Sequence, residues 1–260
     1  MEELDFDQFI TFIKMKTNID LAQYKEVQMK RRLTTLRDKR GFSSFKQYSE
    51  ALVNDKQLLV ELLDRITINV TEFFRNPARW EVLYNRFLPE LIQQSTSSKL
   101  KVWSAACSTG EEPYTLAMLL HELQVLQRSE LHATDLDIQA LQKAQEAIYV
   151  DRSLRDTPPA YVQRYFVEED GQYRITDKLK QAIIFRQQNL LADTFERNFD
   201  LIVCRNVMIY FTEEAKTILY TKFAEALKPG GILFVGSTEQ IFSPALFGLE
   251  TADTFFYRKL

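Results

Sequence analysis

Acidic residues follow two predicted strands at the points where each strand gives way to a helix. Glu111 and Glu112 come after the apolar run Leu100–Ala105, and Asp135 ends the run at 131–134. Ligands of open α/β sheets bind at the carboxyl ends of the strands, and an acid roughly 20 residues after the first turn binds ribose hydroxyls. Two carboxylates at the start of a helix would repel a pyrophosphate and suit a cationic cofactor. The spacing therefore predicts a ribose-binding site for a cofactor that carries positive charge.

The turn after the first predicted strand consists of small residues, ACSTG, which lets a cofactor approach the backbone. Gly110 is its only glycine, so the turn lacks the G-x-G-x-x-G pattern of dinucleotide-binding proteins. An ordinary tight turn explains this segment equally well. A carboxylate after the second strand can also cap the following helix. We assign the cofactor role to Asp135 and the capping role to Asp137.

A polar pair, Arg205-Asn206, follows the apolar run at 200–204. The end of a buried parallel strand is a ligand-facing position, which makes both residues site candidates. Arg205 is also explained as a polar strand end that faces water. That explanation is weaker for Tyr210, because it lies within the apolar run VMIYF.

The segment INVTEFFRNP precedes the strands and combines polar and aromatic residues. Capping of a helix by Asn69 or Thr71 is the simpler interpretation. The pair Phe73-Phe74 beside Arg75 is unusual, and it suggests an aromatic wall that seals a pocket.

The elements that must position these residues form two units. Residues 1–75 carry apolar side chains at helical spacing throughout, with Ser43-Ser44 and Asn54-Asp55 as helix caps, and predict an all-helical N-terminal domain. Residues 76–260 alternate strands and helices and predict a doubly wound, Rossmann-like α/β domain with a parallel sheet. The polar stretch at 93–99 is a plausible surface connection.

The second unit also carries an interruption. Pro158-Pro159 breaks the alternation, and the turn signal Glu169-Asp170-Gly171 predicts a small β insert over about 161–176. Around it we expect strands at 100–105, 131–134, 183–185, 200–204, 232–236 and 254–258, and helices at 112–123, 138–149 and 213–227.

Charge and composition exclude several classes of protein. The chain has 33 Lys and Arg against 36 Asp and Glu, which argues against a protein built mainly to hold nucleic acid. No apolar run approaches the roughly 18 residues of a membrane span, and the acidic start MEELDFDQ shows no secretory signal. The two histidines and the cysteines Cys107 and Cys204 show no zinc-ligand spacing. We expect no metal, free packed thiols and a cytoplasmic location.

Taken together, six motifs resemble those of the chemotaxis receptor methyltransferases, the CheR family: ITINVTEFFRN, VWSAACSTGEEPYTLA, ATDLD, RQQNLL, DLIVCRNVMIYF and KPGGILFVGSTEQI. The resemblance runs in order from about residue 5 to residue 258. It implies an S-adenosylmethionine-dependent protein-glutamate O-methyltransferase with a class I methyltransferase domain. The substrates would be glutamates of chemotaxis receptors, and the products would be glutamyl methyl esters and S-adenosylhomocysteine. The β insert resembles the β-subdomain of that family.

The resemblance also implies the roles of individual residues. Arg75 and Tyr210 match positions that the family associates with placing the substrate glutamate, so they are the candidate catalytic residues. The cofactor-binding residues would be Asn69, Thr71, Arg75, Glu112, Asp135, Asn189, Leu190, Arg205 and Asn206.

Residues 25–40 form a basic stripe, with seven Lys and Arg against Glu26 and Asp38. A solvated helix face is the simpler explanation of such a run. In an acidic chain, a basic stripe also suits an acidic partner, and the resemblance points to receptor helices that bear several glutamates. We expect a monomer whose receptor-docking residues are Lys30, Arg31, Arg37 and Arg40.

Three alternatives remain open. A methyltransferase of the same fold can act on RNA or a small molecule, although Asn206 is not followed by the Pro-Pro-aromatic motif of some nucleic-acid methyltransferases. A non-catalytic scaffold that binds cofactor and receptor is disfavoured by the presence of both Arg75 and Tyr210. A nicotinamide-dependent oxidoreductase is disfavoured by the single glycine and the paired glutamates of the first turn.

Overall fold

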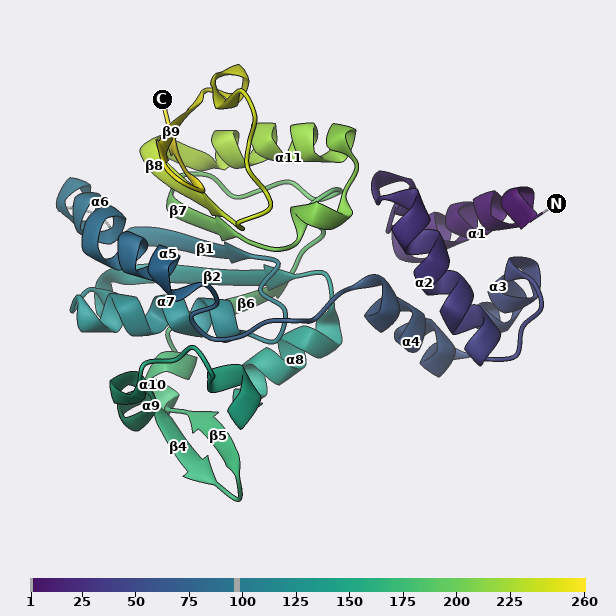
Figure 1. The fold of residues 1–260 in the computed structure, drawn as a ribbon, viewed down its shortest axis with the longest axis horizontal. Helices are drawn as coiled ribbons and strands as arrows, with labels where there is room; N and C mark the ends of the chain where they lie inside the picture. Colours follow the sequence, from purple (N-terminus) through teal and green to yellow (C-terminus); the bar gives the residue numbers. More distant parts are fainter. Residues whose placement is uncertain (1, 96–98) are drawn as a thin grey trace.

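The computed structural model describes residues 2–95 and 99–260, so the predicted connection at 93–99 lies partly outside the described residues. A bundle of helices stands off one end of a large β sheet, and a smaller sheet projects from the same α/β unit (Figure 1). The arrowheads of β1 and β2 point toward the bundle, so the carboxyl ends of these strands face it (Figure 1). The predicted fold class, an α/β domain preceded by helices, is confirmed.

The N-terminal bundle packs around one apolar core that includes Phe9, Leu33, Tyr48 and Leu62. Ser44 accepts the backbone N–H of Gln47 and Asp55 accepts those of Gln57 and Leu58, which confirms both predicted caps. The elements are α1 (Glu2–Thr17), the 3-10 helix η1 (Leu21–Gln23), α2 (Glu26–Lys39), α3 (Phe45–Asn54) and α4 (Lys56–Ile66).

The linker at 67–76 is not helical, so the prediction of helix throughout 1–75 is wrong there. Thr67 and Asn69 donate side-chain hydrogen bonds to Asp137 of the α/β domain, at 2.9 and 2.7 Å. Phe73 and Phe74 are buried in the core of that domain. These tertiary contacts hold the linker in an extended path that local helical spacing does not reveal.

The main sheet has seven strands in the order β6-β2-β1-β7-β8-β10-β9. The pairs from β6 through β8 are parallel, and β10 is antiparallel to both of its neighbours. The order reverses between β1 and β7, which is the switch point where open α/β sheets bind ligands. The bounds are β1 (Leu100–Ala105), β2 (Ser129–Asp135), β6 (Ile183–Gln187), β7 (Phe199–Cys204), β8 (Leu227–Val235), β9 (Leu249–Asp253) and β10 (Phe256–Lys259).

Helices cover both faces of this sheet. One core joins the sheet to α5 (Pro77–Val82), the π-helix η2 (Leu83–Phe87), α6 (Leu88–Gln94), α7 (Glu111–Glu122) and α8 (Ile138–Glu146). The other core joins the opposite face to α11 (Glu213–Ala226). Short 3-10 turns lie at η3 (Leu126–Arg128), η5 (Met208–Tyr210) and η6 (Pro244–Phe247). No helix among the described residues is long and apolar enough to cross a membrane.

The small sheet has the order β3-β5-β4, and it extends the predicted insert toward the N-terminus, because β3 lies before residue 161. The predicted helix at 138–149 ends early because Ala147 adopts a left-handed conformation, with φ of 58°. The β-branched and aromatic residues that follow then form a strand. Tyr161 was expected in the hairpin but is helical, since Pro159 starts a helix before it. The bounds are β3 (Ile148–Val150), η4 (Asp151–Leu154), α9 (Pro159–Tyr165), β4 (Phe166–Glu169), β5 (Gln172–Ile175) and α10 (Asp177–Lys180).

Candidate active site

A cleft lies between the carboxyl ends of the central strands and the N-terminal bundle, with an empty volume of about 1000 Å³ including its open mouth. Residues far apart in the sequence meet here, from the linker, the strand ends and the bundle. All of the residues predicted to bind cofactor or to act in catalysis line this one cleft: Asn69, Thr71, Arg75, Glu112, Asp135, Asn189, Leu190, Arg205, Asn206 and Tyr210.

The turn after β1 owes its shape to left-handed backbone conformations at Ala106, Ser108 and Gly110. At Gly110 a β-carbon would lie 2.9 Å from the Cβ of Ala144 and from the hydroxyl of Tyr149. The single glycine therefore lets the start of α7 pack closely against its neighbours. The small residues Ala106, Cys107 and Ser108 line the cleft.

Asp135 lies at the end of β2 and is buried, with 7% of its surface exposed. Its carboxylate accepts the backbone N–H groups of Ser108 and Asp137, at 2.7 and 2.9 Å. Burial raises the pKa of Asp135 to about 6, and the two N–H groups limit the rise. Asp137 caps α8 by accepting the N–H groups of Gln139 and Ala140, as predicted.

The paired glutamates of the first turn have different surroundings. Glu112 lines the cleft, accepts a hydrogen bond from the Ser104 hydroxyl at 2.8 Å, and lies 3.9 Å from a guanidinium nitrogen of Arg205. Glu111 is buried outside the cleft lining and bonds the Thr109 hydroxyl. Burial raises the pKa of each glutamate to about 7. Glu112 is thus the member of the pair that can contact a ligand.

Arg205 is buried beneath the cleft and does not face water, so its alternative interpretation as an exposed strand end is wrong. Its guanidinium lies over the rings of Trp80 and Phe234 and donates to the backbone oxygen of Arg75 at 2.7 Å. Burial lowers its pKa, while the charge of Glu112 opposes this effect. Arg205 therefore holds the linker at Arg75 against the end of β7.

The linker residues join the cleft without capping a helix. Asn69 accepts a hydrogen bond from the Ser108 hydroxyl at 2.8 Å and donates to Asp137, while α5 begins after Asn76. Arg75 is half-buried and donates to the backbone oxygen of Val70 at 3.1 Å. The capping interpretation of Asn69 and Thr71 is therefore wrong.

The predicted aromatic wall is also absent from the lining of the cleft. Phe73 packs edge-on against Tyr149 and Phe166, and Phe74 packs edge-on against Tyr161. The pair therefore anchors the linker to the core and to the small sheet, and it does not seal the pocket.

Comparison with known proteins decides the family. Residues 69–256 match the model of the CheR methyltransferase SAM-binding domain, and residues 4–67 match that of the CheR all-alpha domain. The chain belongs to the CheR methyltransferase family. A chemotaxis protein methyltransferase of Listeria monocytogenes is 44% identical over 99% of this chain and 98% of the relative. Those of Borreliella burgdorferi and Pseudomonas aeruginosa are 35% and 34% identical, over 90% and 91% of this chain and 88% and 90% of the relatives.

S-adenosylmethionine is the cofactor of this domain. The donor set of the cleft fits it, because the molecule combines ribose hydroxyls with a positive sulfonium. Asp135 offers carboxylate oxygens at the end of β2, and Glu112 adds a second carboxylate beside the first turn. The small side chains of that turn leave the backbone open to a ligand.

The CheR fold also supplies cleft residues that the sequence patterns did not single out. Tyr24 of the bundle lines the cleft and packs edge-on against Phe211, with ring centroids 5.1 Å apart. Beside this contact, the backbone N–H of Lys25 donates to the backbone oxygen of Tyr210 at 2.8 Å. The backbone N–H of Thr212 donates to the backbone oxygen of Gln23 at 2.9 Å. No local signal marks Tyr24, because its role depends on how the bundle meets the strand ends.

Several side chains of the basic stripe already have partners within the N-terminal bundle. Arg37 is buried, pairs with Asp38 and lies over the Phe45 ring at 4.7 Å. Arg40 forms an ion pair with Glu61 at 2.6 Å, and Lys30 lies 5.3 Å from the centre of the Phe6 ring. These partners within the bundle already engage three of the four predicted docking residues.

Arg31 instead lines a groove beside the active-site cleft. Arg32, which was not among the predicted docking residues, lies over the Tyr210 ring at 5.7 Å. Tyr210 lines both the groove and the cleft, so it forms the wall between them. The basic groove is lined by Val27, Gln28, Arg31, Arg32, Thr35, Arg65 and Tyr210.

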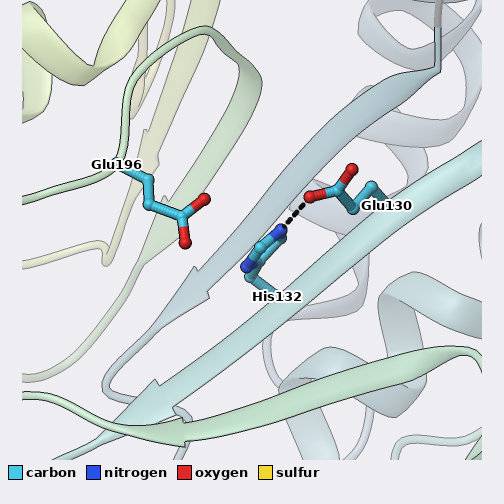
Figure 2. Close-up of side chains that lie close together, drawn as sticks. All are labelled: Glu130, His132 and Glu196. Atoms are coloured by element: carbon cyan, nitrogen blue, oxygen red, sulfur yellow. Dashed lines mark hydrogen bonds and ion pairs between the residues drawn. The ribbon is translucent and has the colours of Figure 1, made fainter.

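A separate cluster combines Glu130 and the buried His132 of β2 with Glu196 of the loop before β7 (Figure 2). A ring nitrogen of His132 lies 2.6 Å from Glu130. Glu196 forms ion pairs with Lys101 and Arg186, at 2.9 and 2.5 Å. These two cations already neutralise Glu196, which disfavours it as a ligand for a metal ion.

Proposed function

We propose that this CheR-family enzyme methylates the γ-carboxylates of glutamates on chemotaxis receptors, as a cytoplasmic monomer. The observation that carries the proposal is the shared wall at Tyr210. On one side lies the cofactor cleft with its carboxylates, and on the other lies a groove with Arg31, Arg32 and Arg65. An acidic helix in the groove would bring a glutamate to the point where the two sites meet.

The names of the relatives favour the same substrate class, since each is a chemotaxis protein methyltransferase. The RNA alternative lacks comparable support. The chain is acidic overall, with a net charge of −3, and its basic residues concentrate in one stripe. A groove of that kind suits a partner with clustered carboxylates.

The cleft needs no general base for this reaction. A glutamate side chain has an ordinary pKa of about 4.3 and is ionised at neutral pH. Neither His121 nor His132, the only histidines of the chain, lines the cleft. When bound, S-adenosylmethionine supplies an electrophilic methyl group on a positive sulfonium. The work left to the protein is to exclude water and to align the carboxylate oxygen.

Arg75 and Tyr210 are the residues we assign to alignment. The Arg75 guanidinium is half-buried in the cleft and can hold a carboxylate by charge-assisted hydrogen bonds. Tyr210 lies where the groove meets the cleft and can either bond the same carboxylate or line the path of the methyl group. Apolar surroundings from Tyr24, Val207 and Phe211 limit the access of water.

The remaining predicted residues would hold the cofactor. Asp135 would accept the ribose hydroxyls, and Glu112 would face its positive charge. Asn189 and Leu190, after β6, would meet the adenine. Asn69, Thr71, Arg205 and Asn206 would complete the binding site from the linker and the end of β7.

The residues proposed to dock the receptor differ from those predicted from the sequence. Because Arg37 is buried in the bundle and Arg40 is paired with Glu61 at its surface, we propose that Arg31, Arg32 and Arg65 make the main contacts with the receptor. Lys30 lies on the same helix and contributes less, since its ammonium lies against Phe6.

The test is transfer of a labelled methyl group from S-adenosylmethionine to membranes that contain chemoreceptors, followed by release of the label in alkali. We expect alkali-labile label on receptor protein, lost in Arg75→Ala and retained in Arg197→Ala. Arg197 is 71% exposed on a loop and serves as the matched control. Alkali-stable label, or label on RNA and not on receptor, contradicts the proposal.

A further inference from the structure

Glu239 is a buried carboxylate that lies outside the lining of the cleft. It belongs to the GSTEQI segment that follows β8, and its side chain is held by backbone groups. One carboxylate oxygen accepts the N–H groups of Met208 and Ile209, at 2.6 and 3.3 Å. The other accepts those of Asn206 and Gly236, at 2.6 and 2.8 Å.

Three of these N–H groups belong to the turn after β7. This turn connects Arg205 to Tyr210, and it carries Asn206, Val207 and Tyr210 into the lining of the cleft. Asn206 adopts a left-handed backbone conformation, with φ of 62°, which asparagine tolerates better than most residues other than glycine. The carboxylate of Glu239 satisfies three backbone N–H groups of this turn and so holds it in one conformation.

Gly236 makes room for this arrangement. A β-carbon at this position would lie 2.3 Å from a carboxylate oxygen of Glu239 and 2.9 Å from the backbone nitrogen of Asn206. Both distances are too short for a side chain, although the φ of Gly236 is not positive. The glycine is needed because the carboxylate and the turn approach the strand end so closely.

We infer that Glu239 is a positioning residue of the active site. It fixes the turn between β7 and η5, and through that turn it places Asn206 toward the cofactor and Tyr210 toward the substrate. Fixing Tyr210 also fixes its backbone oxygen, which accepts the N–H of Lys25 from the bundle. Glu239 itself touches no reactant. The part of this inference that concerns Tyr210 rests on the proposed function, while the part that concerns the cofactor does not.

The chemistry of a carboxylate explains why glutamate is needed. Each of its oxygens accepts two N–H groups here, whereas a glutamine amide has one such oxygen and an NH₂ group that donates. In Glu239→Gln the NH₂ group would face two backbone donors, and the turn would have to move. Gly236→Ala would displace the carboxylate oxygen that accepts the N–H groups of Asn206 and Gly236. Both variants should therefore produce the same defect.

The test compares Glu239→Gln, Gly236→Ala and the double variant with two controls. Glu250→Gln changes an exposed glutamate, and Leu120→Ala removes a buried side chain from the far end of α7. We would measure the melting temperature, the Kd for S-adenosylhomocysteine by calorimetry, and kcat for receptor methylation well below the melting temperature. The calorimetric Kd reports on the cofactor side even when no receptor substrate is accepted.

We expect Glu239→Gln and Gly236→Ala each to raise the Kd and to lower kcat by about tenfold. The double variant should fall little further, because both changes disturb one contact. Leu120→Ala should lower the melting temperature while leaving Kd and kcat near those of the wild type. Normal Kd and kcat in folded Glu239→Gln would overturn the inference, as would equal losses in Leu120→Ala at the same melting temperature. Wild-type protein that binds cofactor but methylates no receptor would count against the proposed function, and the Kd comparison would still decide the role of Glu239.

Discussion

The charged side chains of the cofactor cleft and those of the basic groove, which Tyr210 separates, differ in burial and in hydrogen bonding. In the cleft, Asp135 is buried and its carboxylate accepts backbone N–H groups of Ser108 and Asp137. In the groove, Arg31 and Arg65 are exposed at the ends of long, flexible side chains. Buried and bonded charges are fixed before a ligand arrives, whereas exposed charges act through a screened field. The cleft should therefore bind a small cofactor by fixed geometry, and the groove should attract a larger acidic partner.

The largest effect should follow from removing the fixed carboxylate of Asp135. We expect Asp135→Ala to raise the Kd for S-adenosylmethionine by about 30-fold, since a hydrogen bond to a charged group contributes roughly 2 kcal/mol. The measurement is calorimetry at pH 8, with the exposed Asp64→Ala as the control. A change smaller than about threefold would place the ribose elsewhere in the cleft.

Reversal of charge in the groove should act on the receptor alone. In Arg31→Glu/Arg65→Glu we expect the KM for receptor to rise by about tenfold at low salt and the difference to shrink at about 0.5 M salt. The Kd for cofactor should stay unchanged. Lys39→Glu, an exposed change at the end of α2, is the control. A KM that does not respond to charge reversal or to salt removes the groove from receptor docking.

The pKa of Glu112 gives a prediction for pH. Burial raises it from 4.5 to about 7, so Glu112 becomes protonated as the pH falls below 7 and loses its attraction for a cationic cofactor. We expect the Kd for cofactor to rise by about fivefold between pH 8 and pH 6. Glu112→Gln should bind more weakly at pH 8 and show a flatter profile. An unchanged profile in this variant would assign the titration to another group.

The raised pKa of Glu112 affects stability in the opposite direction: cofactor binding weakens as the pH falls, whereas the folded protein becomes more stable. Because the pKa of Glu112 is higher in the folded protein, ionisation of this group opposes folding, and its contribution to stability falls as the pH rises from 4.5 to 7. Glu112→Gln should remove this part of the fall in cofactor-free protein. Thermal unfolding across this range checks the sign.

Substitution of Arg37, which is buried in the N-terminal bundle, should have the smallest effect on receptor binding. We expect Arg37→Ala to destabilise the protein by about 1 kcal/mol, through loss of its contact with Phe45 and of its buried stem. The KM for receptor should stay within about twofold of the wild type, since the side chain is not available to a partner. Urea unfolding and receptor titration measure the two quantities, and a large rise in KM without loss of stability would restore Arg37 as a docking residue.

Sequence patterns predicted the fold best where local signals and tertiary structure agree. The apolar run Leu100–Ala105 became β1 with its predicted bounds, and the caps Ser44 and Asp55 start helices as expected. The pattern failed at 67–76, because contacts with Asp137 and with the core of the other domain decide the path of the linker. It also missed β3, which begins where Ala147 ends the predicted helix, and the short strand β9, which pairs with β10.

For the candidate site, the family motifs located the residues of the α/β domain that meet in the cleft, such as Asp135 and Asn206. They did not find Tyr24, which reaches the cleft only through the packing of the bundle. They also could not separate Arg31 from Arg37, since both are basic residues of one helix. Burial and ion pairs distinguish the two, and these depend on neighbours such as Phe45 and Asp38.

The position of Tyr24 has a consequence for how enzymes of this kind can change. The N-terminal bundle carries Tyr24, which lines the cofactor cleft, and all residues except Tyr210 of the groove proposed to bind the partner. An exchange of the N-terminal module between relatives would therefore alter partner choice and cofactor retention together. A single substitution in the groove, by contrast, leaves the edge contact between Tyr24 and Phe211 in place.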